Sequence, residues 1–254
     1  MNVTSRGISD VGRKREHNED SLLIDDALGL YIVADGMGGH QGGGTASRLA
    51  VETIRESLRA AKANGASVPH QGPLEENPLR EVLRSAVERA CRSIFQAAQT
   101  DPGLQGMGTT VTALALDDQA AFVAHVGDSR CYLIRGEEIF QVSEDHSLVN
   151  EQLKAGAITP EEARTSRFRN IITRSVGFEE QVAVDLLGLE VKPGDRMLVC
   201  CDGLSNLVED GEILQVVREG PLEAVPQKLV DLANDRGGDD NITVIVLQVG
   251  ESAP

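Results

Sequence analysis

The stretch GTTVTALALDDQAAFVAHVGDSRCYLIRGEEIFQV, residues 108–142, decides the fold class of this 254-residue chain. Its residues follow a period of two and most are β-branched or small, which is typical of strands. Breaks fall at Asp117-Asp118, Gly127-Asp128-Ser129 and Gly136-Glu137. These connections are too short for helical crossovers, so the pattern predicts an antiparallel meander in which Ala120–Val126 and Arg130–Ile134 are neighbouring strands.

Helical patterns lie on both sides of this stretch. One helix is predicted over Thr45–Lys62, and another begins at Asn77-Pro78, a cap residue with proline in the first turn, and ends near Asp101. Two shorter helices are predicted at Asp210–Arg218 and Leu222–Asn234. The remaining strands are predicted at Val3–Ser9, Ser21–Asp25, Leu28–Ala34, Val182–Val191, Arg196–Cys201 and Ile242–Val249. Because strands and helices are segregated along the chain, the order favours an α+β fold over a doubly wound parallel sheet.

The charge balance excludes several classes of protein. The chain has 24 Lys and Arg against 40 Asp and Glu, a net charge of −16, which argues against binding nucleic acid or an anionic membrane. Aromatic residues are only 3% and tryptophan is absent, so a base-stacking platform is not expected. No apolar run is long enough to span a bilayer and the first residues lack the apolar core of a secretory signal, so we expect a cytoplasmic protein.

The four cysteines support the same compartment. Cys91, Cys131, Cys200 and Cys201 show no metal-ligand spacing, and the adjacent pair lies in an apolar run. We interpret them as buried free thiols of a reduced cytosol.

Acidic residues next to glycine stand at the ends of several predicted strands. They are Asp35 in IVADG, Asp128 in HVGD, Asp202 in VCCDG and Asp240 in GGDDNITVIV, and the pair Glu19-Asp20 precedes another strand. Each could be an ordinary turn residue. If the strands lie in packed sheets, however, their matching ends converge, and carboxylates that share one small volume must either be protonated or hold cations.

This arrangement favours hard divalent ions. Ligands that are all oxygen suit Mg²⁺, Mn²⁺ or Ca²⁺, and their spread along the chain excludes an EF-hand loop. Scattered aspartates fit two-metal hydrolysis of phosphate esters. Arg15, beside Arg13 and Lys14, offers a guanidinium fork for a phosphate. The glycine cluster from Gly36 to Gly44 matches neither a P-loop nor GxGxxG, and its flexibility favours approach of the Gly36 carbonyl to an ion.

Together these motifs resemble the metal-dependent type-2C protein serine/threonine phosphatases in their compact bacterial form. The resemblance extends from about Thr4 to Leu247. It rests on SDVGRKREHNEDS (9–21), YIVADGMGGHQGG (31–43), MGTTVTAL (107–114), AHVGDSRCYLIR (124–135), EDHSLV (144–149), RNIITRSVG (169–177), LVCCDGLSNLV (198–208) and GGDDNITVIV (237–246). Each motif alone is weak, but all of them occur in the family's order.

The resemblance implies a four-layer α/β/β/α sandwich with two Mn²⁺ or Mg²⁺ ions, and a possible third, between two antiparallel sheets. It implies these roles: Asp35 bridges two metals, Asp202 and Asp240 bind the first, the Gly36 carbonyl helps to bind the second, Asp128 joins Asp202 at a third site, and Arg15 binds the phosphate. Glu19 and Asp20 match the family's acidic pair, one a ligand and one behind it, in an order left open. Residues 147–174 correspond to a flap that controls access.

The general acid is not assigned by the resemblance. Many members of the family have a histidine after the Asp-Gly pair, whereas this chain has Met37. His17, His40, His146 and a metal-bound water are the candidates.

These features predict a single catalytic domain over residues 1–254 that hydrolyses phosphoserine and phosphothreonine in proteins. The attacking group is expected to be a metal-activated water. The resemblance implies a bacterial serine/threonine kinase as the opponent, and the lack of long tails favours a monomer. Two alternatives are a small-molecule phosphoesterase and a catalytically silent binding module on the same fold.

Overall fold

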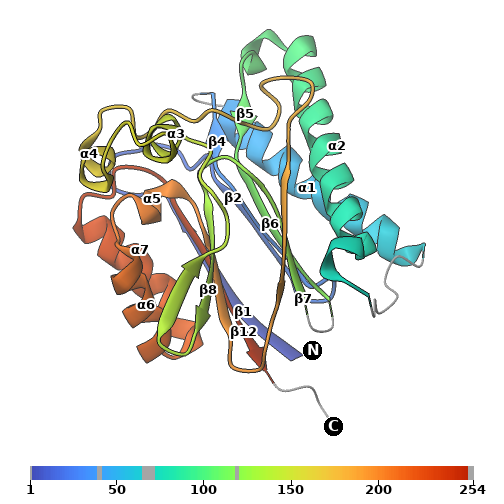
Figure 1. Cartoon of the computed structure of the whole chain (residues 1–254). Coiled ribbons are helices and arrows are strands. Elements are labelled where there is room, and N and C mark those ends of the chain that lie inside the picture. Colours follow the sequence, from blue (N-terminus) through green and yellow to red (C-terminus); the bar gives the residue numbers. More distant parts are fainter. Residues whose placement is uncertain (1, 39–41, 65–71, 118–119, 251–254) are drawn as a thin grey trace.

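Two five-stranded antiparallel sheets lie face to face in the computed structural model, which describes residues 2–38, 42–64, 72–117 and 120–250 (Figure 1). The β11 sheet has the order β1 (Asn2–Asp10), β12 (Ile242–Gly250), β11 (Arg196–Cys200), β8 (Arg130–Arg135) and β9 (Glu138–Gln141). The β6 sheet has the order β10 (Asp185–Glu190), β7 (Ala120–Val126), β6 (Val111–Asp117), β3 (Leu30–Ala34) and β2 (Ser21–Asp25). A two-stranded ribbon joins β4 (Gly36–Met37) to β5 (Gly108–Thr109).

Helices cover the outer face of each sheet, so the predicted four-layer α/β/β/α fold is confirmed (Figure 1). The β6 sheet is covered by α1 (Gly42–Ala63) and α2 (Pro78–Thr100), and the β11 sheet by α5 (Asp202–Ser205), α6 (Asp210–Glu219) and α7 (Val225–Asp235). Short 3₁₀ turns lie at Leu74–Glu76, Pro102–Leu104 and Leu222–Ala224. Within the described ranges, no helix combines the length and the apolar character needed to cross a bilayer.

Three apolar layers hold these four layers together. Tyr31 and Val33 of β3 point into the layer between the sheets, whereas Leu30 and Ile32 pack beneath α1 and α2. Because both faces of the strand are buried, β3 reads as the continuous apolar run LYIVA. The third layer lies between the β11 sheet and the helices α6 and α7.

The predicted meander is wrong at one turn. Strand β7 pairs with β6 and β10, while β8 pairs with β11 and β9, so Gly127-Asp128-Ser129 takes the chain from one sheet to the other. Gly127 has φ +112°, and a Cβ there would lie 2.5 Å from Cγ2 of Thr110. The backbone of Gly127 approaches Thr110, just before β6, so closely that only glycine fits, and at this turn the chain leaves the sheet.

Most other predicted elements are confirmed with shifted ends. The turn at Asp25-Asp26-Ala27 joins β2 to β3, and Asn77 caps α2 by accepting a 2.9 Å hydrogen bond from the Leu79 N–H. Helix α1 begins at Gly42 rather than Thr45, and the strand predicted at Val182–Val191 is confined to β10. The predicted turn residue Asp118 lies outside the described residues.

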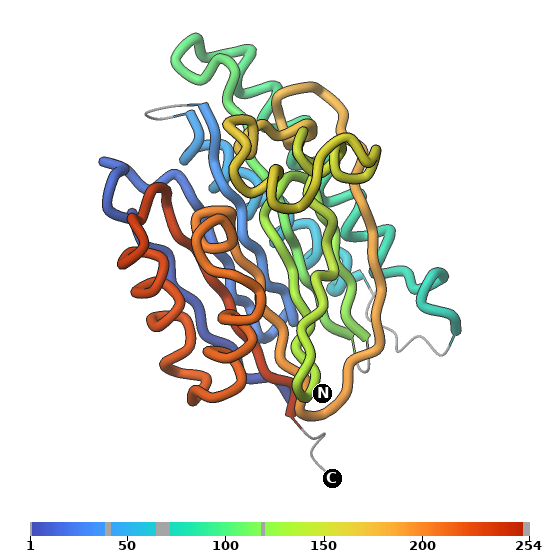
Figure 2. Tube along the Cα trace, turned by 60° about the vertical axis from the view of Figure 1, so that its left-hand side comes forward, coloured from blue at the N-terminus to red at the C-terminus, as the bar shows by residue number. Residues whose placement is uncertain are grey.

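The two termini lie at the edge of the sandwich away from α3 (Leu148–Lys154) and α4 (Pro160–Thr165), as Figure 2 shows. The register agrees, because Asn2 at the start of β1 is paired with Gly250 at the end of β12. The functional residues predicted from the sequence belong to the edge near α3 and α4.

Candidate metal centre

Strand ends from both sheets carry the predicted acidic residues to one edge of the sandwich. In the β6 sheet, Ser21 at the start of β2 is paired with Ala34 at the end of β3, which places Asp20 and Asp35 at the same end. In the β11 sheet, β11 ends and β12 begins at the corresponding edge. Asp202 lies just after the end of β11, and Asp240 lies just before the start of β12. Antiparallel pairing therefore brings together residues that are far apart in the sequence.

The central carboxylates lie close together. Ligand atoms of Asp20, Asp35 and Cys201 all lie within 4.8 Å of each other, and Asp202 is near enough for its charge to raise the pKa of Asp35. Asp128, at the turn between the two sheets, is only 8% exposed. These groups form what we call the carboxylate cluster: Glu19, Asp20, Asp35, Asp128, Asp202 and Asp240.

Burial and mutual repulsion make the cluster electrostatically costly. Burial, followed by the charges of Asp20 and Asp202, raises the pKa of Asp35 well above its ordinary value. Burial raises the pKa of Asp20 to about 7, against the hydrogen bond from Thr243, and that of Asp128 to about 8. Carboxylates in such a site either take up protons or bind cations.

The free oxygens of the cluster suit a divalent ion. Glu19 Oε1, Asp20 Oδ1 and Asp202 Oδ1 are buried and have no hydrogen-bond partner among the described residues. Buried polar atoms of folded proteins are normally satisfied, so these atoms are suited to a ligand. The nearby Cys201 is not a competing donor, because burial raises the pKa of its thiol well above the ordinary value and its sulfur accepts from the Thr243 N–H. The donor set is therefore all oxygen, as Mg²⁺ or Mn²⁺ requires.

Gly36 brings its carbonyl next to the Glu19 carboxylate. A Cβ built on Gly43, at the start of α1, would lie 2.8 Å from both Glu19 Oε1 and the Gly36 carbonyl oxygen. A Cβ on Gly36 would lie 2.4 Å from the Glu19 carbonyl oxygen, so only glycine permits this approach. Glu19 thus faces the Gly36 carbonyl, whereas Asp20 lies with Asp35 and Cys201.

Arg15 is the member of the basic trio that contacts the cluster. Its guanidinium donates to Asp240 Oδ2 at 2.6 Å, and its side chain is 50% exposed. Lys14 instead pairs with Asp239 at 2.6 Å. The structure thus places Arg15 at the rim of the cluster, where its half-exposed side chain can reach a ligand.

The hydroxyl groups that hold the carboxylate residues in place were not predicted from the sequence. The backbone of Asp35 is clamped by Thr110, whose Oγ1 accepts the Asp35 N–H at 3.0 Å, and by Thr109, which donates to the Asp35 carbonyl at 2.8 Å. Thr243 donates to Asp20 Oδ2 at 2.6 Å. The neighbouring motifs MGTT and DNIT carry these threonines, so their polar residues were the available signal.

A model of the family "Protein phosphatase 2C" matches residues 11–240 of the chain. The chain belongs to the protein phosphatase 2C family.

Individual relatives agree with this membership. Protein phosphatase PhpP of Streptococcus pneumoniae is 40% identical over 248 residues, 96% of each chain. The solved structure of the serine/threonine phosphatase Stp1 from Staphylococcus aureus has a TM-score of 0.88 and 32% identity, and covers 99% of this chain and 96% of its own. The catalytic domain of the serine/threonine protein phosphatase PstP, solved with two manganese ions, has a TM-score of 0.85 and 33% identity over 98% and 99%.

The prediction of a protein serine/threonine phosphatase is thereby confirmed. The manganese ions of PstP agree with the predicted dependence on Mn²⁺ or Mg²⁺. Which carboxylate of the cluster binds which ion in this phosphatase stays a prediction.

The ring of His146, one of the candidate general acids, has both nitrogens within hydrogen-bond distance of other groups in this phosphatase. The side chain is buried, its Nδ1 accepts the Gly127 N–H at 3.1 Å, and its Nε2 lies 3.1 Å from Asp185 Oδ2. Both ring nitrogens are therefore occupied in holding the turn before Asp128. His17 is exposed on the loop between β1 and β2, and His40 lies outside the described residues.

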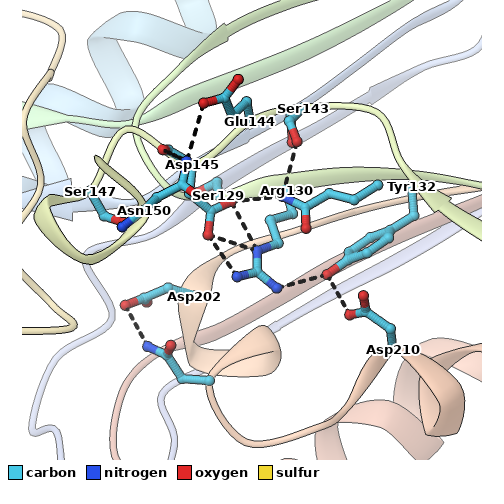
Figure 3. Close-up of polar contacts among 12 residues, drawn as sticks. Ser129, Arg130, Tyr132, Ser143, Glu144, Asp145, Ser147, Asn150, Asp202 and Asp210 are labelled. Carbon is cyan, nitrogen blue, oxygen red and sulfur yellow. Dashed lines mark hydrogen bonds and ion pairs between the residues drawn. The ribbon is translucent and has the colours of Figure 1, made fainter. Parts of the chain in front are cut away.

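A cleft of about 1160 Å³ leads away from Asp128 and Asp202. One wall comes from α3 and α4, within the predicted flap at 147–174, and the other comes from the start of α6. Figure 3 shows a polar network beside the cleft: Arg130 holds Asp145 through Nε and Nη2, and Nη1 donates to the Tyr132 hydroxyl, which donates to Asp210. The volume of the cleft lies above the roughly 300–1,000 Å³ that is usual for small-molecule pockets.

Proposed function

We propose that the carboxylate cluster holds a pair of divalent ions and that this site hydrolyses phosphoserine and phosphothreonine in proteins. The observation that carries the proposal is the set of three buried oxygens without a partner, on Glu19, Asp20 and Asp202, in a cluster with raised pKa values. Such a site is stable when cations neutralise it. The family and the manganese of PstP support the same interpretation.

The positions of the side chains suggest how the ions are divided. Asp35 lies at the centre and would bridge two ions, with Asp202 and Asp240 on the first. The Gly36 carbonyl and Glu19 face one spot and would take the second ion, which leaves Asp20, tied to Thr243, behind Asp35. Asp128, near Asp202, would contribute to a third and weaker site.

Bound divalent ions supply Lewis acidity and a water of lowered pKa. The chain's own residues do the rest. The guanidinium of Arg15 would bind two phosphate oxygens and stabilise the charge that develops on them. The proton for the leaving alkoxide would come from His17, His40, His146 or a water.

Arg15→Ala tests the phosphate role separately from the metals. We expect weaker phosphate binding with Mn²⁺ binding retained, as measured by calorimetry. Loss of Mn²⁺ binding instead would contradict this role of Arg15.

Composition and family membership support proposals about substrates, location and partners. The substrates would be phosphoproteins made by a bacterial serine/threonine kinase. We propose a cytoplasmic monomer with one catalytic domain over residues 1–254, a flap at 147–174, and no nucleic-acid or membrane partner. Its net charge of −16 supports the last point.

A phosphothreonine peptide assay, titrated with Mn²⁺, Mg²⁺ and EDTA, tests the proposal. We expect turnover with either ion and none with excess EDTA. p-Nitrophenyl phosphate and nucleotides are assayed beside the peptide. Preference for the small molecules would favour a small-molecule phosphoesterase, and no metal-dependent turnover of any substrate would favour a silent binding module.

A further inference from the structure

The loop between β1 and β2, residues 11–20, carries Arg15 and Glu19 without helix or strand of its own. A segment of this kind needs contacts from other elements to place a guanidinium next to a carboxylate cluster. Two contacts come from the Arg13 and Lys14 N–H groups, which share the Gly238 carbonyl at 2.8 and 3.2 Å. Ser47 donates to the Glu19 carbonyl at 2.6 Å, and Asn18 donates to the Ser9 hydroxyl at 2.8 Å. Three more contacts come from Asn241.

The side chain of Asn241 makes three hydrogen bonds to the backbone of this loop. Its Oδ1 accepts the Glu19 N–H at 2.8 Å, and its Nδ2 donates to the carbonyls of Val11 and His17, each at 3.0 Å. The residue is 5% exposed. A carboxamide is the side chain that can accept one bond and donate two in this geometry, whereas aspartate would turn a charge toward two carbonyl oxygens.

Asn241 itself is held firmly. Its N–H donates to Asp240 Oδ1 at 2.8 Å, and its carbonyl accepts from the Cys201 thiol at 3.3 Å. A Cβ at Gly203, in α5, would lie 1.9 Å from that carbonyl oxygen, so the backbone of Asn241 is packed directly against the turn that begins at Asp202. One residue thus joins Asp240 through its main chain to the Arg15 loop through its side chain.

We propose that Asn241 is a positioning residue that sets the distance between Arg15 and the metal-binding carboxylates. The inference rests on the proposed function, because it assigns Arg15 to the phosphate and the carboxylates to the ions. Asn241 touches neither phosphate nor metal. It holds the loop so that the Arg15 guanidinium stays beside Asp240.

Asn241→Ala removes all three bonds to the loop. We expect the Mg²⁺-loaded protein to bind inorganic phosphate about tenfold more weakly, as measured by calorimetry, and KM for a phosphothreonine peptide to rise more than kcat falls, because groups that orient a binding residue typically contribute at this level. Hydrogen exchange of the Mg²⁺-loaded protein should show faster exchange of the Glu19 amide. Asn77→Ala is the control, since Asn77 is also buried but caps α2.

The double variant with Arg15→Ala tests whether Asn241 acts through Arg15. If Asn241 acts through Arg15, Asn241→Ala should weaken phosphate binding hardly at all when Arg15 is already alanine. Should Asn241→Ala not fold, Asn241→Asp takes its place, because it keeps an acceptor for Glu19 but loses both donors.

Three outcomes would overturn the proposal. They are an unchanged exchange rate at Glu19, an equal loss of phosphate affinity in the presence and absence of Arg15, and a fall in Mg²⁺ affinity without a change in phosphate affinity. The exchange and phosphate measurements do not depend on turnover, so a wild-type enzyme that fails on phosphopeptides would count against the proposed function and not against the role of Asn241.

Discussion

Two clusters of charged side chains lie along the same cleft and are built in opposite ways. In the carboxylate cluster, Asp20, Asp35 and Asp202 crowd together, and three of the cluster's oxygens lack a partner among the described residues. In the second, which we call the arginine network, Arg130 binds both oxygens of Asp145 and reaches Asp210 through Tyr132. The first is left open for a ligand, and the second is closed on itself.

We expect the carboxylate cluster to serve function and the arginine network to serve stability. A paired and hydrogen-bonded buried ion contributes to the fold, and removal of one partner exposes the cost of burying the other. Unpaired carboxylates lower stability until something neutralises them, so their presence indicates a ligand. Substitutions in the two clusters should therefore affect different measurements.

Asp35→Asn should have the largest effect and should act on turnover. We expect the rate on a phosphothreonine peptide in Mn²⁺ to fall by about a thousandfold or more, because a central charge that organises the site is lost. The fold should be kept, since Thr109 and Thr110 bind the backbone of Asp35 and not its side chain. Near-normal turnover in Mn²⁺ would refute the metal assignment.

The control for this variant is Asp26→Asn. Asp26 accepts hydrogen bonds from Ser5 and Tyr31, next to the β2–β3 turn, through one oxygen that asparagine also provides. Its turnover should equal that of the unmodified enzyme.

Arg130→Ala should act in the opposite way, on stability. It leaves the Asp145 carboxylate, 14% exposed, without its cation, and the expected loss is about 3–5 kcal/mol in the free energy of unfolding. Urea denaturation without added metal measures it. Asp35→Asn in the same experiment should lose little, and a comparable loss in both variants would remove the distinction between the clusters.

Much of the carboxylate cluster could be predicted because strand periodicity and acidic residues at strand ends are both local patterns. Asp35 and Asp202 follow apolar runs whose ends are visible in the sequence, and the Asn77-Pro78 start of α2 is equally local. The change of sheet at Gly127 could not be predicted, because a three-residue turn has the length of a hairpin. It depends on contact with Thr110, seventeen positions earlier in the chain.

The side chains that support the carboxylate cluster were not predicted, because their contacts also join distant parts of the sequence. Asn241 bonds to Glu19, and Thr243 to Asp20, across sequence separations of more than two hundred residues. His146 is a candidate acid, and an isolated histidine in a motif carries no sign of burial. Only its contacts with Gly127 and Asp185 show that both nitrogens are occupied.

His125 gives a pH test of a buried ring whose nitrogens lie within hydrogen-bond distance of the Thr112 hydroxyl and the Glu144 carbonyl. Burial, with the nearby His146 ring, lowers its pKa to about 4, against the opposing effects of Asp145, Asp185 and a hydrogen bond to the Glu144 carbonyl. The unfolded chain, with an ordinary pKa near 6.5, then binds the proton more readily. Stability from this group is complete above pH 6.5 and is lost as the pH falls toward 4, by up to about 3 kcal/mol.

Urea denaturation at pH 7 and pH 5 measures this loss. His125→Gln, which has no titrating ring, should lose less stability between the two pH values than the unmodified protein. His17→Gln is the control, since His17 is exposed. An equal loss in the His125 variant and the unmodified protein would assign the acid sensitivity to other groups.

The ion pair between Arg164 of α4 and Glu209, before α6, should have the smallest effect although it joins the two walls of the cleft. The atoms lie 3.1 Å apart, but the side chains are 71% and 67% exposed. Water screens such a pair, so Arg164→Ala should change the free energy of unfolding by less than about 1 kcal/mol, and less still in high salt. A loss as large as that of Arg130→Ala would show that position across the cleft, and not burial, decides what an ion pair contributes here.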